Sequence, residues 1–365
     1  MDNREEKEYL YWLCHVPLLG AVKIKRLYEF MGSYKRIYTE GKNLAEAGLL
    51  KANEASALNE YKDKLAECQK ELEKTEKKGI RFITSYDKEY PRRLLDIYGY
   101  PAAIFCKGRL PEEERPAAAV VGARNCTNYG RQMAAYMAGE LARAGVQIVS
   151  GLALGIDGSA HEGALKAGGD TYGILGCGIN VCYPRENCKL YERLPQQGGI
   201  LTEFMPQEAP KPCNFPMRNR IISGISDVVL VMEAREKSGS LITASLGLEQ
   251  GKEIFALPGR VTDPLSVGCN RLIADGADSL LSPDAVLEYF HMQRGKMLRV
   301  HEKSGNGLAK KEKMVYSCLD LQPKSLEEIV SLSGLSVSDC MSALLELEMS
   351  GYILQTSHQY YGKKL

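Results

Sequence analysis

The sequence predicts an α/β protein built on a doubly wound, mainly parallel sheet, with a small helical unit before it and a winged helix after it. Between about residues 80 and 290, short apolar runs alternate with amphipathic helical segments. The 365 residues suffice for one large α/β domain with small satellites. We expect a helical domain at 1–79, an α/β domain at 80–290, a basic linker at 291–312 and a winged helix at 313–365.

The first unit shows helical spacing on both sides of a turn at Gly20. An apolar run from Trp12 to Leu19 precedes the turn, and Ile24, Leu27 and Phe30 follow it up to Gly32. The pattern resembles a helix-hairpin-helix module. Because the turn lacks the Gly-x-Gly that lets such a hairpin approach a phosphate, we expect a structural or docking role. Residues 59–78 mix acids and lysines and predict a solvated helix.

The central unit contains six runs that predict strands. They are Ala118–Val121, Gln147–Val149, Tyr172–Leu175, Gly199–Thr202, Val228–Met232 and Glu253–Leu257. Between the first two, Met133, Ala134, Met137 and Leu141 mark one face of a helix. In such sheets ligands bind beyond the carboxyl ends of the strands, so the loops there are the candidate site.

The last unit predicts three helices and a hairpin. A helix at Met314–Leu321 is followed by a second, opened by Ser325 with Glu328 as a capping box, and Gly334 marks a turn. A third helix opens at Ser336 and ends at Gly351, and two strand-like segments follow. The third helix has no basic residue and carries three carboxylates, which repel phosphate. We therefore expect this winged helix to contact protein, not duplex DNA.

Composition excludes several classes of function. The net charge of +1 gives no overall field that attracts DNA, so a nucleic-acid site must be a local patch. The eleven cysteines contain no Cys-x-x-Cys pair, so we expect neither a metal site nor a cofactor. We find no signal peptide and no long apolar segment, and therefore expect a cytoplasmic protein with reduced thiols and no membrane insertion.

Four loops at the predicted carboxyl edge carry groups suited to anions. Gly122 to Thr127 combines small residues with Arg124 ahead of a helix, and Ser150-Gly151 repeats the design after the next strand. Lys211 follows a later strand, and Ser238 and Ser240 lie in the loop after Val228–Met232. Since parallel strands end at one sheet edge, the sequence predicts an anion-binding groove.

The segment from Phe215 to Ser223 adds a stacking surface to these charges. An aromatic ring, the guanidiniums of Arg218 and Arg220, and the amide of Asn219 lie within six residues. A flat ring beside cations suits single-stranded nucleic acid, whose bases offer flat faces and whose backbone offers repeating charge.

Enzymatic alternatives are less well supported by the residues. The loop at Gly122 lacks dinucleotide-binding spacing, and Gly251-Lys252 is followed by Glu253, so no phosphate-binding P-loop forms. His161 and Asp157 lie one helical turn apart, but His161 is more often a satisfied helix residue than a base. We expect no catalytic residue.

Several motifs together closely resemble the DNA-processing protein A (DprA/Smf) family over about residues 87–290. They include Asp87-x-x-Tyr90-Pro91, the loop at 122–127, Ser150-Gly151 through Asp157, and Tyr183-Pro184. Asn214-Phe215-Pro216 through Gly224, Ser238-Gly239-Ser240, Pro258-Gly259 and Gly268-Cys269-Asn270 continue the match. The outer domains match only in outline.

The resemblance implies a Rossmann-like domain that binds single-stranded DNA, forms a homodimer and helps load the RecA recombinase during natural transformation of competent cells. By similarity, Arg124 and Lys211 would hold phosphates, Phe215 would stack on a base, and Arg218, Asn219 and Arg220 would lie along the groove. Amide or hydroxyl contacts would come from Gly122, Thr127, Ser150, Gly151, Ser238 and Ser240. The dimer surface would lie near Leu265–Leu281. Ala123 replaces the serine that is usual in the family.

We therefore predict a non-enzymatic, single-stranded-DNA-binding recombination mediator. The alternative is a nucleotide-ribose hydrolase of the lysine-decarboxylase-like type, whose Pro-Gly-Gly-x-Gly-Thr-x-x-Glu loop is here replaced by Ser238 to Thr243. A duplex-binding regulator is a third possibility, which the acidic third helix of the winged unit disfavours.

Overall fold

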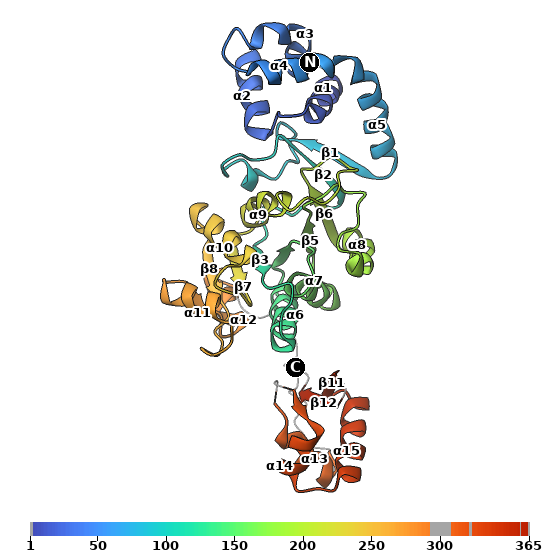
Figure 1. The fold of residues 1–365 in the computed structure, drawn as a ribbon, viewed down its shortest axis with the longest axis vertical. Coiled ribbons are helices and arrows are strands. Elements are labelled where there is room, and N and C mark those ends of the chain that lie inside the picture. Colours follow the sequence, from blue (N-terminus) through green and yellow to red (C-terminus); the bar gives the residue numbers. More distant parts are fainter. Residues whose placement is uncertain (1–2, 293–307, 321–322, 358, 364–365) are drawn as a thin grey trace.

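A computed structural model describes residues 3–292, 308–320, 323–357 and 359–363 (Figure 1). Helices at the amino end, a central α/β unit and a small carboxyl-terminal unit follow one another along the longest axis of the molecule. The basic linker predicted at 291–312 lies mostly outside the described residues. Its last residues begin a helix at Lys310, three residues before the predicted boundary.

The central sheet has nine strands in the described part of the chain, in the order β1-β2-β6-β5-β4-β3-β7-β8-β9. In this order, each strand from β6 through β5, β4, β3, β7 and β8 to β9 is parallel to its neighbours. Strands β1 and β2 are added at one edge by antiparallel pairing. Their bounds are β1 Ile80–Thr84, β2 Ala103–Gly108, β3 Ala117–Val121, β4 Gln147–Ser150, β5 Thr171–Ile174, β6 Gly198–Thr202, β7 Val228–Val231, β8 Glu253–Ala256 and β9 Asp278–Ser279. The predicted doubly wound α/β fold is confirmed.

Helices cover both faces of the sheet because side chains of a strand alternate between its faces. In β3, Ala118 and Val120 pack with α6, α7 and α12, whereas Ala119 and Val121 pack with α9, α10 and α11. The helices of the first layer are α6 Asn128–Arg143, α7 Ile156–Lys166 and α12 Pro283–Tyr289. Those of the second are α9 Asn214–Ile225, α10 Gly239–Glu249 and α11 Val267–Ala274; α8 Cys188–Arg193 lies between β5 and β6 along the chain.

The sequence did not predict β1, β2 or β9. The predicted strands were continuous apolar runs, whereas β1 contains Arg81, and β2 ends with Lys107 and Gly108. The antiparallel pair β1–β2 joins the helical unit to the sheet, since Phe82 and Phe105 pack with Tyr11 of the first helix.

The amino-terminal unit is helical, as predicted. Its helices are α1 Asn3–His15, α2 Ala21–Met31, α3 Tyr34–Glu40, α4 Ala52–Glu60 and α5 Leu65–Lys77. Ile24 and Leu27 of α2 are buried, whereas Phe30 is exposed. One detail of the prediction is wrong: α5 is not simply solvated, because it buries Cys68, Leu72 and Thr75.

The carboxyl-terminal unit has the predicted winged-helix pattern. It contains α13 Lys310–Cys318, α14 Leu326–Ser333 and α15 Val337–Met349, with a sheet of β10 Lys324–Ser325, β12 Tyr360–Lys363 and β11 Ile353–Ser357. The Ser325–Glu328 capping box is confirmed, and Gly334 ends α14 in the left-handed region at a φ of 67°.

Among the described residues, no single helix is long and apolar enough to cross a membrane, although α14 and α15 together reach the required length as a pair bent by 108°. All eleven cysteines are unpaired thiols. No group of three or more metal-ligating side chains occurs in the described ranges.

Candidate nucleic-acid interface

The carboxyl edge of the parallel strands carries a shallow pocket of about 50 Å³. Arg124 from the loop after β3 and Phe215 from the start of α9 meet there, with the guanidinium carbon 5.0 Å from the ring centroid. Arg124 is exposed and the ring is half-buried. The lining comes from Arg124, Gly151, Ala153, Leu154, Leu175, Gly176, Tyr183, Pro184, Phe215 and Arg218. The prediction that Arg124 and Phe215 lie on the same face of the molecule is confirmed by this contact.

A second ring extends the aromatic surface. Tyr183 lies 5.6 Å from Phe215, centroid to centroid, with 33° between the ring planes, and its side chain is exposed. Tyr183 belongs to the Tyr183-Pro184 motif, but no local pattern in the sequence predicts that it lies beside Phe215. The long loop between β5 and α8 brings the two together.

Phe215 is held in place by close backbone packing. A Cβ on Gly176 would lie 2.6 Å from the Phe215 ring, so only glycine permits this approach. One turn further along α9, the buried Arg218 donates from Nη1 to the carbonyl of Gly151 at 2.6 Å and also to the carbonyl of Ile174. These bonds tie the start of α9 to the ends of β4 and β5.

Arg218 is a buried cation beneath the pocket rather than an exposed groove residue. Burial lowers the pKa of its guanidinium to about 10, while the nearby Asp157 carboxylate favours the charged form. The backbone amide of Gly151 donates to Asp157 Oδ2 at 3.0 Å. A Cβ on Gly151 would lie 2.4 Å from Arg218 Nη1, so the loop after β4 needs its glycine.

His161 is a buried structural residue. The Thr171 hydroxyl donates to the carbonyl of Ile148 at 3.0 Å and therefore accepts from His161 Nδ1 at 2.7 Å. Burial lowers the pKa of the imidazole to about 3, so it stays neutral near pH 7. A neutral, enclosed imidazole agrees with the sequence interpretation of a helix residue rather than a base.

The crevice at the topological switch point, between β3 and β7, is closed by a carboxylate. Glu233, in the loop after β7, accepts from the Thr127 amide at 2.8 Å and from the Thr127 hydroxyl. Burial raises the pKa of Glu233, and the Thr127 hydrogen bonds oppose that rise. A Cβ on Gly130 would lie 2.4 Å from this carboxylate. Glu233 thus occupies the amino end of α6, where a bound phosphate would otherwise lie.

Several predicted contact groups are engaged in internal bonds. The Thr127 amide and hydroxyl bind Glu233, and the buried Ser150 hydroxyl donates to the carbonyl of Val120 at 2.6 Å. The packing leaves no room for a side chain at position 122, because a Cβ on Gly122 would lie 2.6 Å from Ile156 Cγ1. The expectation that these groups face an anion was based on loop composition, which does not distinguish a ligand contact from a packing requirement.

The amino end of α10 lies beside α9 rather than in the pocket lining. Ser238 caps the helix by accepting from the Ser240 amide at 3.3 Å, and the two hydroxyls are 2.6 Å apart. Asn219 donates from Nδ2 to the carbonyl of Gly239 at 3.2 Å. The Asn219 bond therefore joins α9 to α10, whereas the two serines bond to each other at the amino end of α10.

The two remaining predicted cations differ in exposure. Lys211 is exposed and lies 3.0 Å from Glu208 Oε1, close in sequence to Phe215. Arg220 is largely buried and pairs with Glu203 at 2.5 Å, away from the pocket lining. The expectation that Arg220 lines the groove is wrong in this geometry, because α9 turns its side chain toward the loop after β6.

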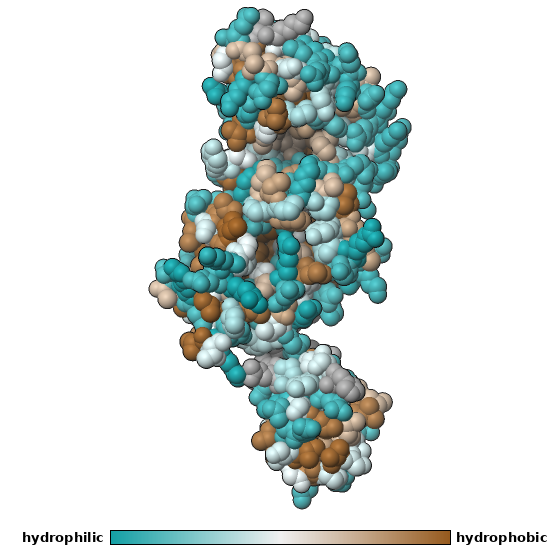
Figure 2. Space-filling model, viewed as in Figure 1, coloured by the Kyte–Doolittle hydropathy of each residue, from teal (hydrophilic) through white to brown (hydrophobic). Residues whose placement is uncertain are grey.

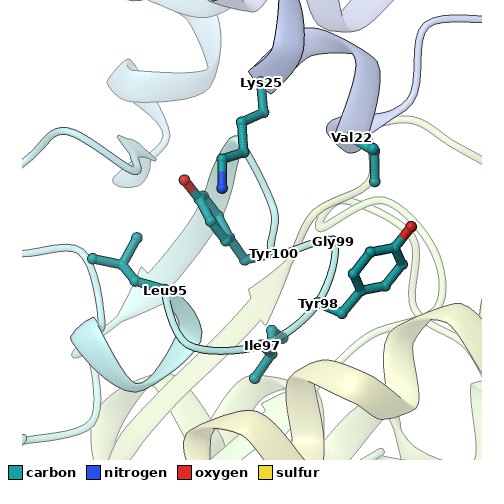
Figure 3. Close-up of a pocket in the computed structure, with 7 residues that line it drawn as sticks. All are labelled: Val22, Lys25, Leu95, Ile97, Tyr98, Gly99 and Tyr100. Atoms are coloured by element: carbon teal, nitrogen blue, oxygen red, sulfur yellow. The ribbon is translucent and has the colours of Figure 1, made fainter. Parts of the chain in front are cut away.

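A larger cavity of about 170 Å³ lies elsewhere, between α2 and residues 95–100 (Figure 3). Lys25 points to the ring of Tyr100, 4.4 Å from its centroid, and Val22 and Tyr98 flank the opening. Size does not make it the better candidate. Four of the predicted site residues, Arg124, Gly151, Phe215 and Arg218, line the smaller pocket, where segments that follow four neighbouring strands meet.

Fold and site together define an α/β protein with a cation–aromatic surface at the carboxyl edge of its sheet and a separate winged helix. The family model for DNA recombination-mediator protein A matches residues 81–291, and the model for the DprA winged helix domain matches residues 301–357. The chain therefore belongs to the DprA/Smf family of DNA processing proteins.

Curated relatives agree with this assignment. The chain is 44% identical to DNA processing protein DprA of Bacillus subtilis over 211 residues, which cover 58% of this chain and 71% of that protein. It is 37% identical to Protein Smf of Escherichia coli over 284 residues, 76% of each chain.

Solved structures of relatives share the fold. The X-ray structure of DNA processing protein A from Streptococcus pneumoniae superposes with a TM-score of 0.67 at 33% identity, covering 77% of this chain and 97% of that one. DNA processing protein A from Helicobacter pylori, whose structure concerns its single-stranded-DNA-binding mode, gives a TM-score of 0.52 at 30% identity. Its match covers 58% of this chain and 96% of that one.

Proposed function

We propose that this protein binds single-stranded DNA over the pocket formed by Arg124, Phe215 and Tyr183, and that it acts as a recombination mediator. The observation that carries the proposal is the 5.0 Å contact between the Arg124 guanidinium and the Phe215 ring. An exposed cation beside one exposed and one half-buried aromatic ring serves a strand whose bases stack and whose phosphates follow one another at short intervals.

The exposure of each side chain indicates its role in the interface. Arg124 and Lys211 contact phosphates. Both side chains are exposed, so each can form a charge-assisted hydrogen bond to a phosphate of the strand without a change in the fold. Phe215 and Tyr183 present ring faces to bases. Arg218 does not need to touch DNA. Its bonds to Gly151 and Ile174 hold the ring-bearing end of α9 against the sheet.

The geometry gives slight sequence preference. Stacking and phosphate contacts do not read the hydrogen-bonding edges of bases, and every base has a face that can stack. We therefore expect similar affinity for different single strands, with a modest effect of stacking strength.

A nucleotide-hydrolysing function has less support. The Glu233 carboxylate occupies the amino end of α6 at the switch point, where it would repel a nucleotide phosphate. His161 is enclosed and neutral, so it offers no base to a substrate. The nucleotide-ribose hydrolase alternative predicts release of free base from nucleoside monophosphates, which a base-release assay measures directly.

The mediator role includes helping to load RecA on the bound strand, in the cytoplasm, during natural transformation or other recombination, with the protein acting as a homodimer. The family description as a recombination mediator supports the role. The segment proposed for dimerisation, Leu265–Leu281, includes the exposed apolar side chains of Val267 and Leu281, as a protein–protein surface requires.

The experiment that tests the function compares affinities by fluorescence anisotropy. A 20-nucleotide oligo-dT and a duplex of equal length are titrated with the protein at two salt concentrations. The proposal predicts tighter binding to the single strand at both. Equal or tighter binding to duplex would refute it. Recombinase loading is tested separately, by the rate at which RecA assembles on the bound oligonucleotide with and without the protein.

A further inference from the structure

The third helix of the winged-helix unit presents a row of unpartnered apolar side chains. Val337, Met341, Leu345 and Met349 recur every four residues along α15 and are 56%, 45%, 58% and 77% exposed. Residues four apart lie on the same side of an α-helix, so these four form one stripe. Cys340, Ala343, Leu344 and Leu347 are buried on the opposite side.

A further apolar side chain is exposed on the neighbouring helix. Leu332, near the end of α14, is 60% exposed, and α14 packs against α15. Figure 2 shows apolar side chains gathered on the winged-helix unit at the bottom of the view. Single exposed apolar residues are common, but an aligned row on one helix is typical of an interaction surface.

The charges of α15 restrict what can cover the stripe. The helix has no Lys or Arg. Its exposed residues Glu346 and Glu348 lie next to the apolar stripe and form its border. The Glu348 carboxylate accepts from the backbone amide of Gln355 in β11 at 3.3 Å. The third acidic residue, Asp339, pairs with Lys311 of α13 at 2.6 Å. The two remaining carboxylates leave the border of the stripe acidic.

An acidic border disfavours three occupants. Duplex DNA and an anionic lipid surface both carry negative charge, which Glu346 and Glu348 repel. A second copy that laid its α15 parallel to this one along the stripe would bring equal carboxylates together. A polypeptide with apolar side chains and Lys or Arg beside them complements both the stripe and its border.

We propose that α15 is a docking surface for a basic amphipathic helix of another protein, bound along Val337, Met341, Leu345 and Met349. The 13 residues of α15 extend for roughly 18 Å at about 1.5 Å per residue, so the partner helix needs about three turns. Its apolar residues recur three and four apart, and its lysines or arginines meet Glu346 and Glu348. The winged helix thus recruits a protein to the chain that holds the DNA strand.

The test uses the full-length protein and a library of displayed 16-residue peptides. Peptides captured by the wild-type chain are counter-selected on the double variant Met341→Ser, Leu345→Ser, which removes the centre of the stripe without touching the buried side of α15. The expected consensus has apolar residues at helical spacing and Lys or Arg beside them. The absence of a consensus, or an acidic one, would overturn the proposal.

A selected peptide is then titrated by anisotropy. We expect at least tenfold weaker binding to the double variant, unchanged binding to the matched surface variant Val261→Ser, and loss of preference for basic peptides in Glu346→Lys. Far-ultraviolet circular dichroism and retained oligo-dT affinity show that each variant is folded. Oligo-dT binding also separates this proposal from the DNA-binding one, since either can fail alone.

Alternative occupants are measured on the same variants. Vesicles of phosphatidylcholine with phosphatidylserine test a membrane, a 20-base-pair duplex tests DNA, and sedimentation tests self-association. The proposal requires that none of these interactions be weakened by Met341→Ser, Leu345→Ser. Stripe-dependent binding to vesicles, duplex or a second copy would overturn it.

Discussion

The guanidinium carbon of Arg124 lies 5.0 Å from the ring centroid of Phe215, although Arg124 belongs to the loop after β3 and Phe215 to the helix that follows β6. β3 and β6 are separated in the sheet by β4 and β5, and α9 crosses back over them to bring its first residues to Arg124. This crossing places a cation, a ring and the second ring of Tyr183 on one surface.

Removal of the Phe215 ring tests stacking. Phe215→Ala should weaken oligo-dT binding by about 1–3 kcal/mol, since base–aromatic stacking contributes that much per base. Phe215→Tyr keeps the flat face and should bind within about twofold of wild type. Tyr98→Ala, which removes an exposed ring elsewhere, is the matched control and should change little. Equal losses in Phe215→Ala and Tyr98→Ala would contradict the assignment.

Salt dependence tests the phosphate contacts. The double variant Arg124→Gln, Lys211→Gln should flatten the plot of log affinity against log salt by about 1.4, which is about 0.7 for each lost contact to a single strand. Lys166→Gln removes an exposed cation that lies near Glu162, outside the pocket, and serves as the control. An unchanged slope in the double variant would show that the strand runs elsewhere.

The carboxylate at the switch point should stabilise the fold. Glu233→Ala removes the acceptor of the Thr127 amide and hydroxyl, and leaving partly buried donors unpaired costs about 1–3 kcal/mol. We expect a lower Tm than for Glu236→Ala, which removes an exposed carboxylate from the same loop. Identical Tm values for the two variants would show that Glu233 is dispensable at the amino end of α6.

Acid should destabilise the protein through His161. Its pKa is about 3 in the folded chain and about 6.5 when unfolded, so the unfolded state binds a proton that the folded state excludes between these values. Stability from this group is therefore lost as pH falls from about 6.5 toward 3, by up to about 1.4 kcal/mol per pH unit. Calorimetry from pH 8 to pH 5 should show a steeper fall of Tm for wild type than for His161→Leu. Parallel curves would contradict this.

Most of the fold could be predicted because its pattern is local. The six predicted strands are buried on both faces and therefore form continuous apolar runs, and Ser325 with Glu328 is a short-range cap. The strands β1 and β2 carry polar residues such as Arg81 and Lys107, and antiparallel pairing at the edge of the sheet tolerates them.

The candidate site was predicted less completely, because loop composition does not say which partner a group takes. Ser150 and Thr127 have the small polar character of anion-binding loops, yet their hydroxyls bond to Val120 and Glu233. Arg218 and Arg220 lie two residues apart on α9 and therefore point in different directions, one beneath the pocket and one toward Glu203. These choices depend on distant parts of the chain.

Photocrosslinking gives the most direct test that a single strand lies over the Arg124–Phe215 pocket. Oligo-dT with one 5-iododeoxyuridine is bound to the full-length protein and irradiated, and the attached peptide is sequenced by mass spectrometry. The strand should attach at Phe215 or Tyr183, and the yield should fall in Arg124→Gln. Attachment confined to the Tyr98–Tyr100 cavity or to the winged-helix unit would contradict the account.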